Sequence, residues 1–220
     1  MPDRPYLTWP VFRRSGVAAF ARSVTVEVKG ISGIPTDDDA LQASKYVIPR
    51  MKEFNRTDIQ ALGIINHQRN RPPLQRENVD LFRRDILDNA EEQEFGLLTT
   101  WDLFRLARSQ TRNNWPASVV LPVLYRIGRI DPVPEHYEQI GLIEKWFDAI
   151  SVIGFTTAAT FGVGSRIGIE FPNDFVEAQA ASVEVERVAM MEAPAGAPVA
   201  VKVALADAPI GARVFLVRDV

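Results

Sequence analysis

Alternating apolar and polar residues mark a strand near the start of the chain. From Val24 to Val28 every second residue is a valine, and polar residues stand between and after the valines, which is the period of a β-strand. Glu27 and Lys29 therefore project from one face of this strand, about 7 Å apart along it. One interpretation is that Glu27 and Lys29 form only a solvated ion pair, which would contribute under about 1 kcal/mol to stability. The alternative is a metal-binding carboxylate beside a charge-stabilising lysine.

The elements that follow this strand alternate between helix and strand. Thr36 followed by Asp37, Asp38 and Asp39 indicates a helix start, and the helical spacing after it predicts a helix that Pro49 kinks or ends. Short apolar runs predict buried strands at residues 61–66 and 95–100, and apolar residues at helical spacing predict helices at residues 78–92 and 101–108. This order predicts an α/β layer with at least partly parallel strands.

The second half of the chain has a different pattern. Short apolar stretches alternate with glycine, proline and Asn-Asp turns, and helical spacing disappears. The predicted strands are residues 139–147, 150–156, 166–170, 179–188, 198–203 and 213–217. The valine alternation shifts its phase near Arg187. Several short strands at close spacing predict a small β-barrel.

Composition and charge support two domains. The chain has 220 residues, 46% of them hydrophobic, and no cysteine, so thiolate metal sites and disulfides are excluded. The net charge is +1 over residues 1–138 and −4 over residues 139–220, which together give −3. The Asp-Pro-Val-Pro stretch at residues 131–134 is typical of a linker. We predict domains at residues 1–130 and 139–220.

Targeting signals are not evident in the sequence. No run of eighteen apolar residues occurs, and the first residues lack the apolar region of a secretory signal. We therefore expect no membrane partner and a cytoplasmic location.

The first half resembles the restriction-endonuclease-like superfamily, whose signature is written PD-(D/E)xK. The resemblance rests on Glu27-Val28-Lys29, on a following helix with Gln42 and Tyr46, and on the stretches GIINHQRNRPP and LLTTWDLFRL. It covers about residues 17–110. It implies an α/β domain with a mixed sheet flanked by helices.

The resemblance also implies a nuclease site. In this superfamily an upstream Asp and the Glu, here Glu27, hold a divalent cation such as Mg²⁺, which activates water. Lys29 would offset negative charge on the phosphate, Gln42 would orient water or substrate, and Tyr46 would support Gln42. DNA or RNA would be the substrate.

The sequence departs from this pattern at the upstream acid. Between Arg4 and Val26 there is neither Asp nor Glu, and Asp3 lies too far back. Either the chain begins late within an N-terminally incomplete domain, or the site has decayed. Because Mg²⁺ gives up its water reluctantly, one carboxylate binds it poorly.

A basic loop follows the strand at residues 61–66. His67, Arg69, Arg71 and Arg76 are candidate nucleic-acid-binding residues, because cations displace phosphate counterions. The alternative is an ordinary solvated loop. The chain has two histidines, too few for a histidine zinc cluster.

The second half resembles domain II of the translation elongation factor Tu class. The resemblance rests on IGLIEKWFDAISVIGFTT, FGVGSRIGIE, ASVEVERVAMMEAPAGAPVAVKV and PIGARVFLV, and it covers residues 139–219. Ser165 replaces the usual Asp. Such barrels contact ribonucleoprotein in translation factors and serve as accessory modules elsewhere. Val152-Ile153 and Met190-Met191 could form an apolar docking patch, or they could pack in the core.

Two functions follow from these observations. The first is a nuclease-related protein that processes or binds nucleic acid, with Glu27, Lys29 and Gln42 as what remains of a Mg²⁺ site. The alternative is a non-catalytic interaction module whose β-barrel binds a protein or ribonucleoprotein partner. The sequence leaves the oligomeric state open.

The missing upstream acid predicts weak or absent nuclease activity. In a plasmid-nicking assay with Mg²⁺ or Mn²⁺, the chain should leave supercoiled DNA intact because one carboxylate holds the metal poorly. Cleavage that Glu27→Ala abolishes would contradict the prediction of a decayed site.

Overall fold

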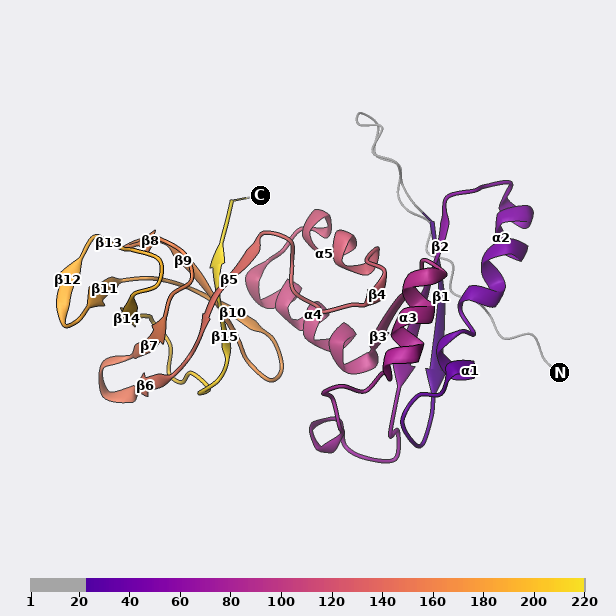
Figure 1. Cartoon of the computed structure of the whole chain (residues 1–220), viewed down its shortest axis with the longest axis horizontal. Helices are drawn as coiled ribbons and strands as arrows, with labels where there is room; N and C mark the ends of the chain where they lie inside the picture. Colours follow the sequence, from indigo (N-terminus) through magenta and orange to yellow (C-terminus); the bar gives the residue numbers. More distant parts are fainter. Residues whose placement is uncertain (1–22, 220) are drawn as a thin grey trace. The chain divides into compact units, whose positions relative to one another are not determined.

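The computed structural model describes residues 23–219, which divide into two compact units. The first comprises residues 23–103 and Leu121–Asp131 (Figure 1). The second comprises Phe104–Val120 and the residues from Pro132 onward. Residues 17–22, which the first resemblance includes, lie outside the described residues. The predicted boundary between residues 130 and 139 stays a prediction.

A parallel sheet forms the framework of the first unit. Its order is β1-β2-β3-β4, and each neighbouring pair is parallel. The strands are β1 (Ser23–Gly30), β2 (Ile59–Asn66), β3 (Gly96–Thr99) and β4 (Gly128–Arg129). The predicted layer with parallel strands is confirmed. The antiparallel part of the predicted mixed sheet is not found among the described strands.

Short helices connect these strands. They are α1 (Asp37–Ala40), α2 (Val47–Phe54) and α3 (Arg84–Glu92), with 3₁₀ turns η1 (Ser44–Tyr46) and η2 (Pro73–Gln75). The helix predicted after Thr36 is therefore broken into three pieces. Pro49 lies in the first turn of α2, where its missing N–H leaves no helical bond unmade. The helix predicted from residue 78 begins only at Arg84.

Two further helices, α4 (Thr100–Asn113) and α5 (Ala117–Leu124), contribute residues to both units. Thr99 is the N-cap of α4. The Thr99 hydroxyl accepts from the Asp102 N–H at 3.0 Å, and an Asp102 oxygen accepts from the Thr99 N–H at 2.9 Å, which is a capping box. Within residues 23–219 no helix is long and apolar enough to cross a membrane.

The core of the first unit lies between the sheet and helices α1 and α3. Its buried side chains come from α1, β2, α3, β3 and the loops beside them: Ala40, Ala43, Ala61, Ile65, Leu81, Phe82, Ile86, Ala90, Phe95 and Leu97. The neighbouring side chains of β2, Leu62 and Ile64, are also buried. Since both faces of β2 are covered, its sequence is continuously apolar rather than alternating.

From Pro132 onward the second unit forms antiparallel sheets, β10-β9-β15-β5, β12-β11-β14-β7-β6 and β13-β8. Their strands are β5 (Tyr137–Leu142), β6 (Lys145–Phe147), β7 (Val152–Thr156), β8 (Phe161–Gly162), β9 (Arg166–Glu170), β10 (Phe175–Gln179), β11 (Ser182–Val185), β12 (Val188–Met190), β13 (Glu192–Ala193), β14 (Pro198–Lys202) and β15 (Arg213–Val217), with the 3₁₀ turn η3 (Asp148–Ile150). An all-β second half is confirmed. The described strands form these separate sheets, so closure into a barrel stays a prediction.

The predicted strand at residues 179–188 is a hairpin. Glu186 and Arg187 form the turn between β11 and β12, with φ of 51° and 68°. A two-residue hairpin loop with φ above zero at both positions is a type I′ turn. This turn is the physical reason for the phase shift that the valine pattern shows near Arg187.

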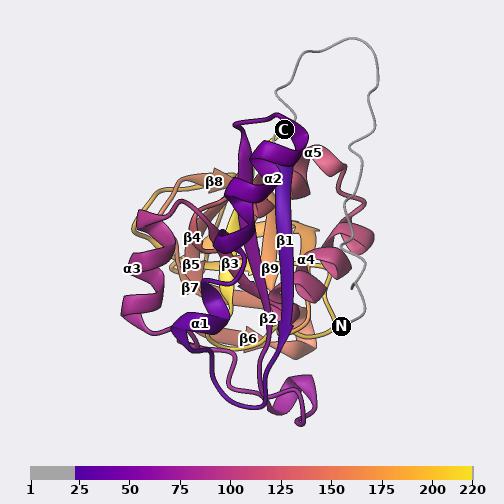
Figure 2. The same cartoon turned by 90° about the vertical axis from the view of Figure 1, so that its right-hand side faces the viewer.

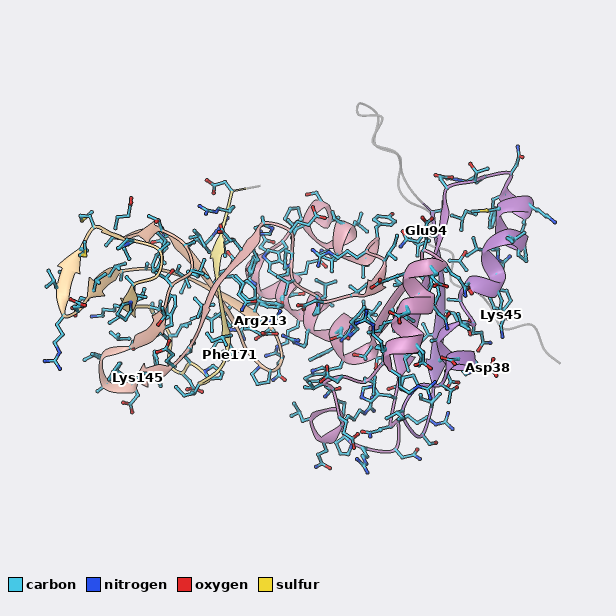
Figure 3. All side chains as sticks on the ribbon, in the orientation of Figure 1. Asp38, Lys45, Glu94, Lys145, Phe171 and Arg213 are labelled. Carbon is cyan, nitrogen blue, oxygen red and sulfur yellow. The ribbon has the colours of Figure 1, made fainter. Side chains whose placement is uncertain are left out.

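Two carboxylates of the β9–β10 hairpin are held by neighbouring donors within the second unit. Glu170 is bound by Arg105 and by Arg213, which is labelled in Figure 3, with an Arg213 Nη2 to Glu170 Oε1 distance of 2.8 Å. Burial raises the pKa of Glu170, but the hydrogen bonds from Arg213 and Arg105 outweigh it and hold the pKa below its usual value.

The same hairpin carries a second, more deeply buried carboxylate. Asp174 is 3% exposed, accepts a hydrogen bond from the Arg108 Nε at 2.8 Å, and forms an ion pair with the Arg112 Nε at 2.9 Å. Next to it, the Phe175 N–H donates to Ser109 and the Phe175 carbonyl accepts from Asn113. These bonds attach residues 104–113 to the hairpin.

Replacing this carboxylate should destabilise the second unit. Asp174→Ala leaves two arginines without their partner, but they can rehydrate because their side chains are about half exposed, so the expected loss in unfolding free energy is about 2 kcal/mol. Urea denaturation measures it. Asp207→Ala, at an exposed acid without an ion pair among the described residues, is the control and should change stability by under about 0.5 kcal/mol. Equal effects would contradict the prediction.

Candidate functional site

Strand β1 lies at one edge of the parallel sheet (Figure 2) and carries Glu27 and Lys29, two of the three predicted catalytic residues. Val26 and Val28 are 40% and 60% exposed, whereas Glu27 and Lys29 are half-buried. The strand therefore turns its valines outward, and Glu27 and Lys29 share the other face, as the alternation predicted.

Lys29 is paired with an acid that sequence analysis treated only as part of a helix start. Its Nζ lies 2.7 Å from Asp39 Oδ1, and the Asp39 side chain also accepts from the N–H and hydroxyl of Thr36. Burial raises the pKa of Asp39, but the hydrogen bonds from Lys29 and Thr36 outweigh it and lower the pKa overall. Lys29 thus ties β1 to the capped start of α1.

The other members of the predicted site do not join this pair. Among the described residues, no hydrogen bond or ion pair links Glu27 to Lys29 or Gln42. Gln42 is half-buried in the turn after α1, and Tyr46 ends η1. Near this turn Lys45 lies 4.0 Å from Asp38, an exposed pair labelled in Figure 3.

A Mg²⁺ site at Glu27 needs further oxygen ligands. In the described part of the chain, no three His, Cys, Asp or Glu side chains are grouped as metal ligands would be. The donor set there does not fit the ion, and Mg²⁺ binding by Glu27 stays a prediction.

The basic loop after β2 separates its candidates into two kinds. Arg69 and Arg71 are exposed, and Arg71 lies 3.6 Å from Glu77. Arg76 is anchored, because its Nε donates to the Arg71 carbonyl at 2.9 Å and its Nη1 donates to Asn66. His67 is 0% exposed, so its buried position does not suit the surface phosphate contact that the sequence suggested.

His67 is a buried polar side chain at the start of this loop. Neither ring nitrogen has a hydrogen-bond partner of normal geometry in the described structure. Burial lowers the pKa of His67, and the charge of Arg76 lowers it further, while the backbone of Glu77 and the charge of Asp102 act in the opposite direction. The ring is therefore held neutral in the folded chain.

Several apolar side chains of the second unit are exposed, among them a group around β12 that the sequence only partly indicated. Ile153 is buried in the core, but Met190 and Met191 are 39% and 78% exposed. Val188 on β12 is 62% exposed, and Val163, whose N–H donates to the Met191 carbonyl at 2.9 Å, is 39% exposed. We call these four residues, Val163, Val188, Met190 and Met191, the β12 patch.

Comparisons with known proteins show weak likenesses. No protein-family model and no curated protein matches the chain. The C-terminal domain of a Geobacillus thermoleovorans protein described as a U32 peptidase is 15% identical with a TM-score of 0.32, over 36% of this chain and 98% of that domain.

Two translation factors are similar to a comparable degree. Elongation factor SelB from Methanococcus maripaludis is 15% identical with a TM-score of 0.32, over 90% of this chain and 40% of that protein. A bacterial selenocysteine-specific elongation factor is 12% identical with a TM-score of 0.31, over 75% and 27%. This chain spans less than half of either factor, and TM-scores this low assign neither fold nor function.

The neutral state of the buried histidine predicts a pH dependence. Because its folded pKa lies below the ordinary 6.5, the unfolded chain binds the additional proton first, and stability falls as pH drops below about 6.5. Urea denaturation at about pH 7.5 and pH 5 should show this loss, and His67→Gln should reduce it. This range lies above that in which carboxylates titrate.

His136 supplies the comparison, because burial lowers its pKa as well. His136→Gln should remove a separate part of the pH dependence, and the double variant should remove both. An unchanged pH dependence in His67→Gln would show that the ring is already charged or solvated in the folded chain.

Proposed function

We propose that the chain is a non-catalytic interaction module whose second unit binds a protein partner, free or within a ribonucleoprotein, through the β12 patch. The observation that carries the proposal is the exposure of four large apolar side chains at one edge of the second unit. Exposed apolar side chains on neighbouring strands are typical of sites that bind other proteins.

The position of these side chains separates them from ordinary exposed residues. Val188 and Met190 pair across the hairpin with Val185 and Val183, so their side chains lie on the same face of the sheet as that of Val183, which is 1% exposed. The core of the second unit thus continues onto β12, where its last side chains are left uncovered. A partner that covered them would complete the core.

A nucleic-acid-processing role of the first unit is the second candidate. The observation that favours it is the side-by-side placement of Glu27 and Lys29 on the half-buried face of β1, with the exposed Arg69 and Arg71 on the loop after β2. In this role Lys29 and Gln42 would act on the phosphate and on water, whereas Glu27 would need further oxygen ligands before it could hold Mg²⁺. The Lys29–Asp39 ion pair would have to open or reorganise for Lys29 to reach a phosphate.

Affinity capture with the full chain tests the first candidate. The variant Val188→Thr/Met191→Gln makes the patch polar at nearly constant volume and charge. Leu74→Gln/Val79→Thr makes the same changes at exposed positions in the first unit, 70% and 81% exposed, and is the matched control.

A protein retained by the wild type and by the control but lost by the patch variant is the expected partner. With that protein purified, the patch variant should bind at least about tenfold more weakly, because removing anchors from an apolar contact costs more than 1 kcal/mol. Equal binding by all three chains would overturn the proposal.

A further inference from the structure

We infer that the partner segment is an extended peptide with alternating apolar and basic residues, which adds a strand to the free edge of β12. This inference rests on the proposed function and names the chemistry of the partner. It is based on the free backbone edge of β12, on the two faces of the β11–β12 hairpin and on the unpaired acids near this edge.

The backbone of β12 is open at Ala189. β12 is the last strand of its five-stranded sheet. In a hairpin with a two-residue turn the closing pair, here Val185 and Val188, exchanges its hydrogen bonds, so the next residue directs its N–H and C=O away from the hairpin. Consistent with this alternation, the Met191 carbonyl also points away from β11 and accepts from Val163 at 2.9 Å. Ala189 therefore offers the pair of bonds that an added strand needs.

The two faces of the hairpin define what the added strand must carry. Side chains opposite Val188 and Met190 would lie on the apolar face and continue the core. Ala189 pairs with Glu184 on the other face. A lysine or arginine placed opposite Ala189 would reach across this small side chain toward the Glu184 carboxylate.

Acids surround the edge without internal partners. Glu184, Glu186 and Glu192 are exposed, and none forms an ion pair with a described residue. On the β9–β10 hairpin, in contrast, Glu170 and Asp174 are each bound by two arginines. Unpaired carboxylates around an apolar strand complement a basic segment and repel a phosphate backbone.

A second copy of this chain fits the edge poorly. A two-fold axis through Ala189 would pair β12 with itself and place Glu186 of one copy opposite Glu192 of the other, on both sides of the axis. Like charges directly opposite each other destabilise a strand pair. The acidic ends of β12 therefore disfavour self-association and favour a basic partner.

Peptide binding to the full chain tests the inference by fluorescence anisotropy. The probe is a labelled peptide of about ten residues in which valine and lysine alternate; one comparison peptide has glutamate in place of lysine, and another is N-methylated so that it cannot extend a sheet. The lysine peptide should bind at least about tenfold more tightly than the glutamate peptide and about fivefold more tightly than the N-methylated one.

Protein variants separate a site from a general attraction between opposite charges. Glu186→Lys/Glu192→Lys should weaken binding of the lysine peptide at least about fivefold. Glu135→Lys/Asp207→Lys makes the same change of net charge at exposed acids elsewhere in the second unit, and it should change binding less than about twofold. Equal effects of the two variants, equal binding of the lysine and glutamate peptides, or no binding of either would overturn the inference.

The inference and the proposed function can fail separately. If Val188→Thr/Met191→Gln loses its natural partner while charge reversal and N-methylation have no effect, the β12 patch binds a protein of other chemistry, and only the inference is wrong. If the patch variant retains every partner, the proposed function is wrong as well.

Discussion

The ion pairs of the β9–β10 hairpin are the interaction on which the second unit depends. Glu170 and Asp174 are each bound by two guanidinium groups, and both backbone groups of the buried Phe175, the first residue of β10, bind side chains from residues 104–113. Phe175 also meets the rings of Tyr137 and Phe215 at centroid distances of 5.8 and 5.7 Å. Because a buried acid without its cation is costly, the helical segment and the hairpin require each other. The second unit therefore includes the helical residues 104–113, which the strand pattern of the second half does not predict.

The ion pairs of the β9–β10 hairpin distinguish two kinds of acid in the second half of the chain. The acidic balance of residues 139–220 looks uniform in the sequence, but the structure divides it into acids bound by arginine and acids left free at β12. The free acids lie beside the β12 patch, where uncovered side chains continue the core of the unit. The Glu186–Arg187 turn that connects β11 to β12 holds two non-glycine residues at positive φ, which costs about 1 kcal/mol or more for each. Asn-Gly would form the same turn at lower cost. The residues Glu186 and Arg187 are therefore unfavourable for the backbone conformation of this turn, which directly precedes the proposed binding strand β12.

Period and turn chemistry predicted most of the fold. The alternation at Val24–Val28 and the apolar runs at β2 and β3 predicted strands at the positions where the structure has them. Burial of one face of a strand requires alternating apolar residues, and burial of both faces requires a continuous apolar run. The strands β8, β10 and β13 were not predicted, since strands of two to five residues have little periodicity. Tertiary pairing is harder still. Asp39 was recognised as an acid near a helix start, but no sequence spacing shows that it binds Lys29 from another element. A Thr-x-x-Asp signal at Thr99 was present and marks the true cap of α4.

The Lys29–Asp39 ion pair changes what the β1 strand implies about chemistry. A lysine that stabilises a phosphate must offer its charge to the substrate, whereas this ammonium lies 2.7 Å from a carboxylate whose lowered pKa keeps it ionised. Asp39 is held in turn by Thr36, so the pair is part of the junction between β1 and α1. Release of Lys29 would leave a half-buried carboxylate without its cation, and any phosphate would have to supply more than that loss. The β12 patch requires no such exchange, since a partner there removes apolar surface from water and meets carboxylates that have no partner to give up. For this reason we propose binding at β12 rather than catalysis at β1.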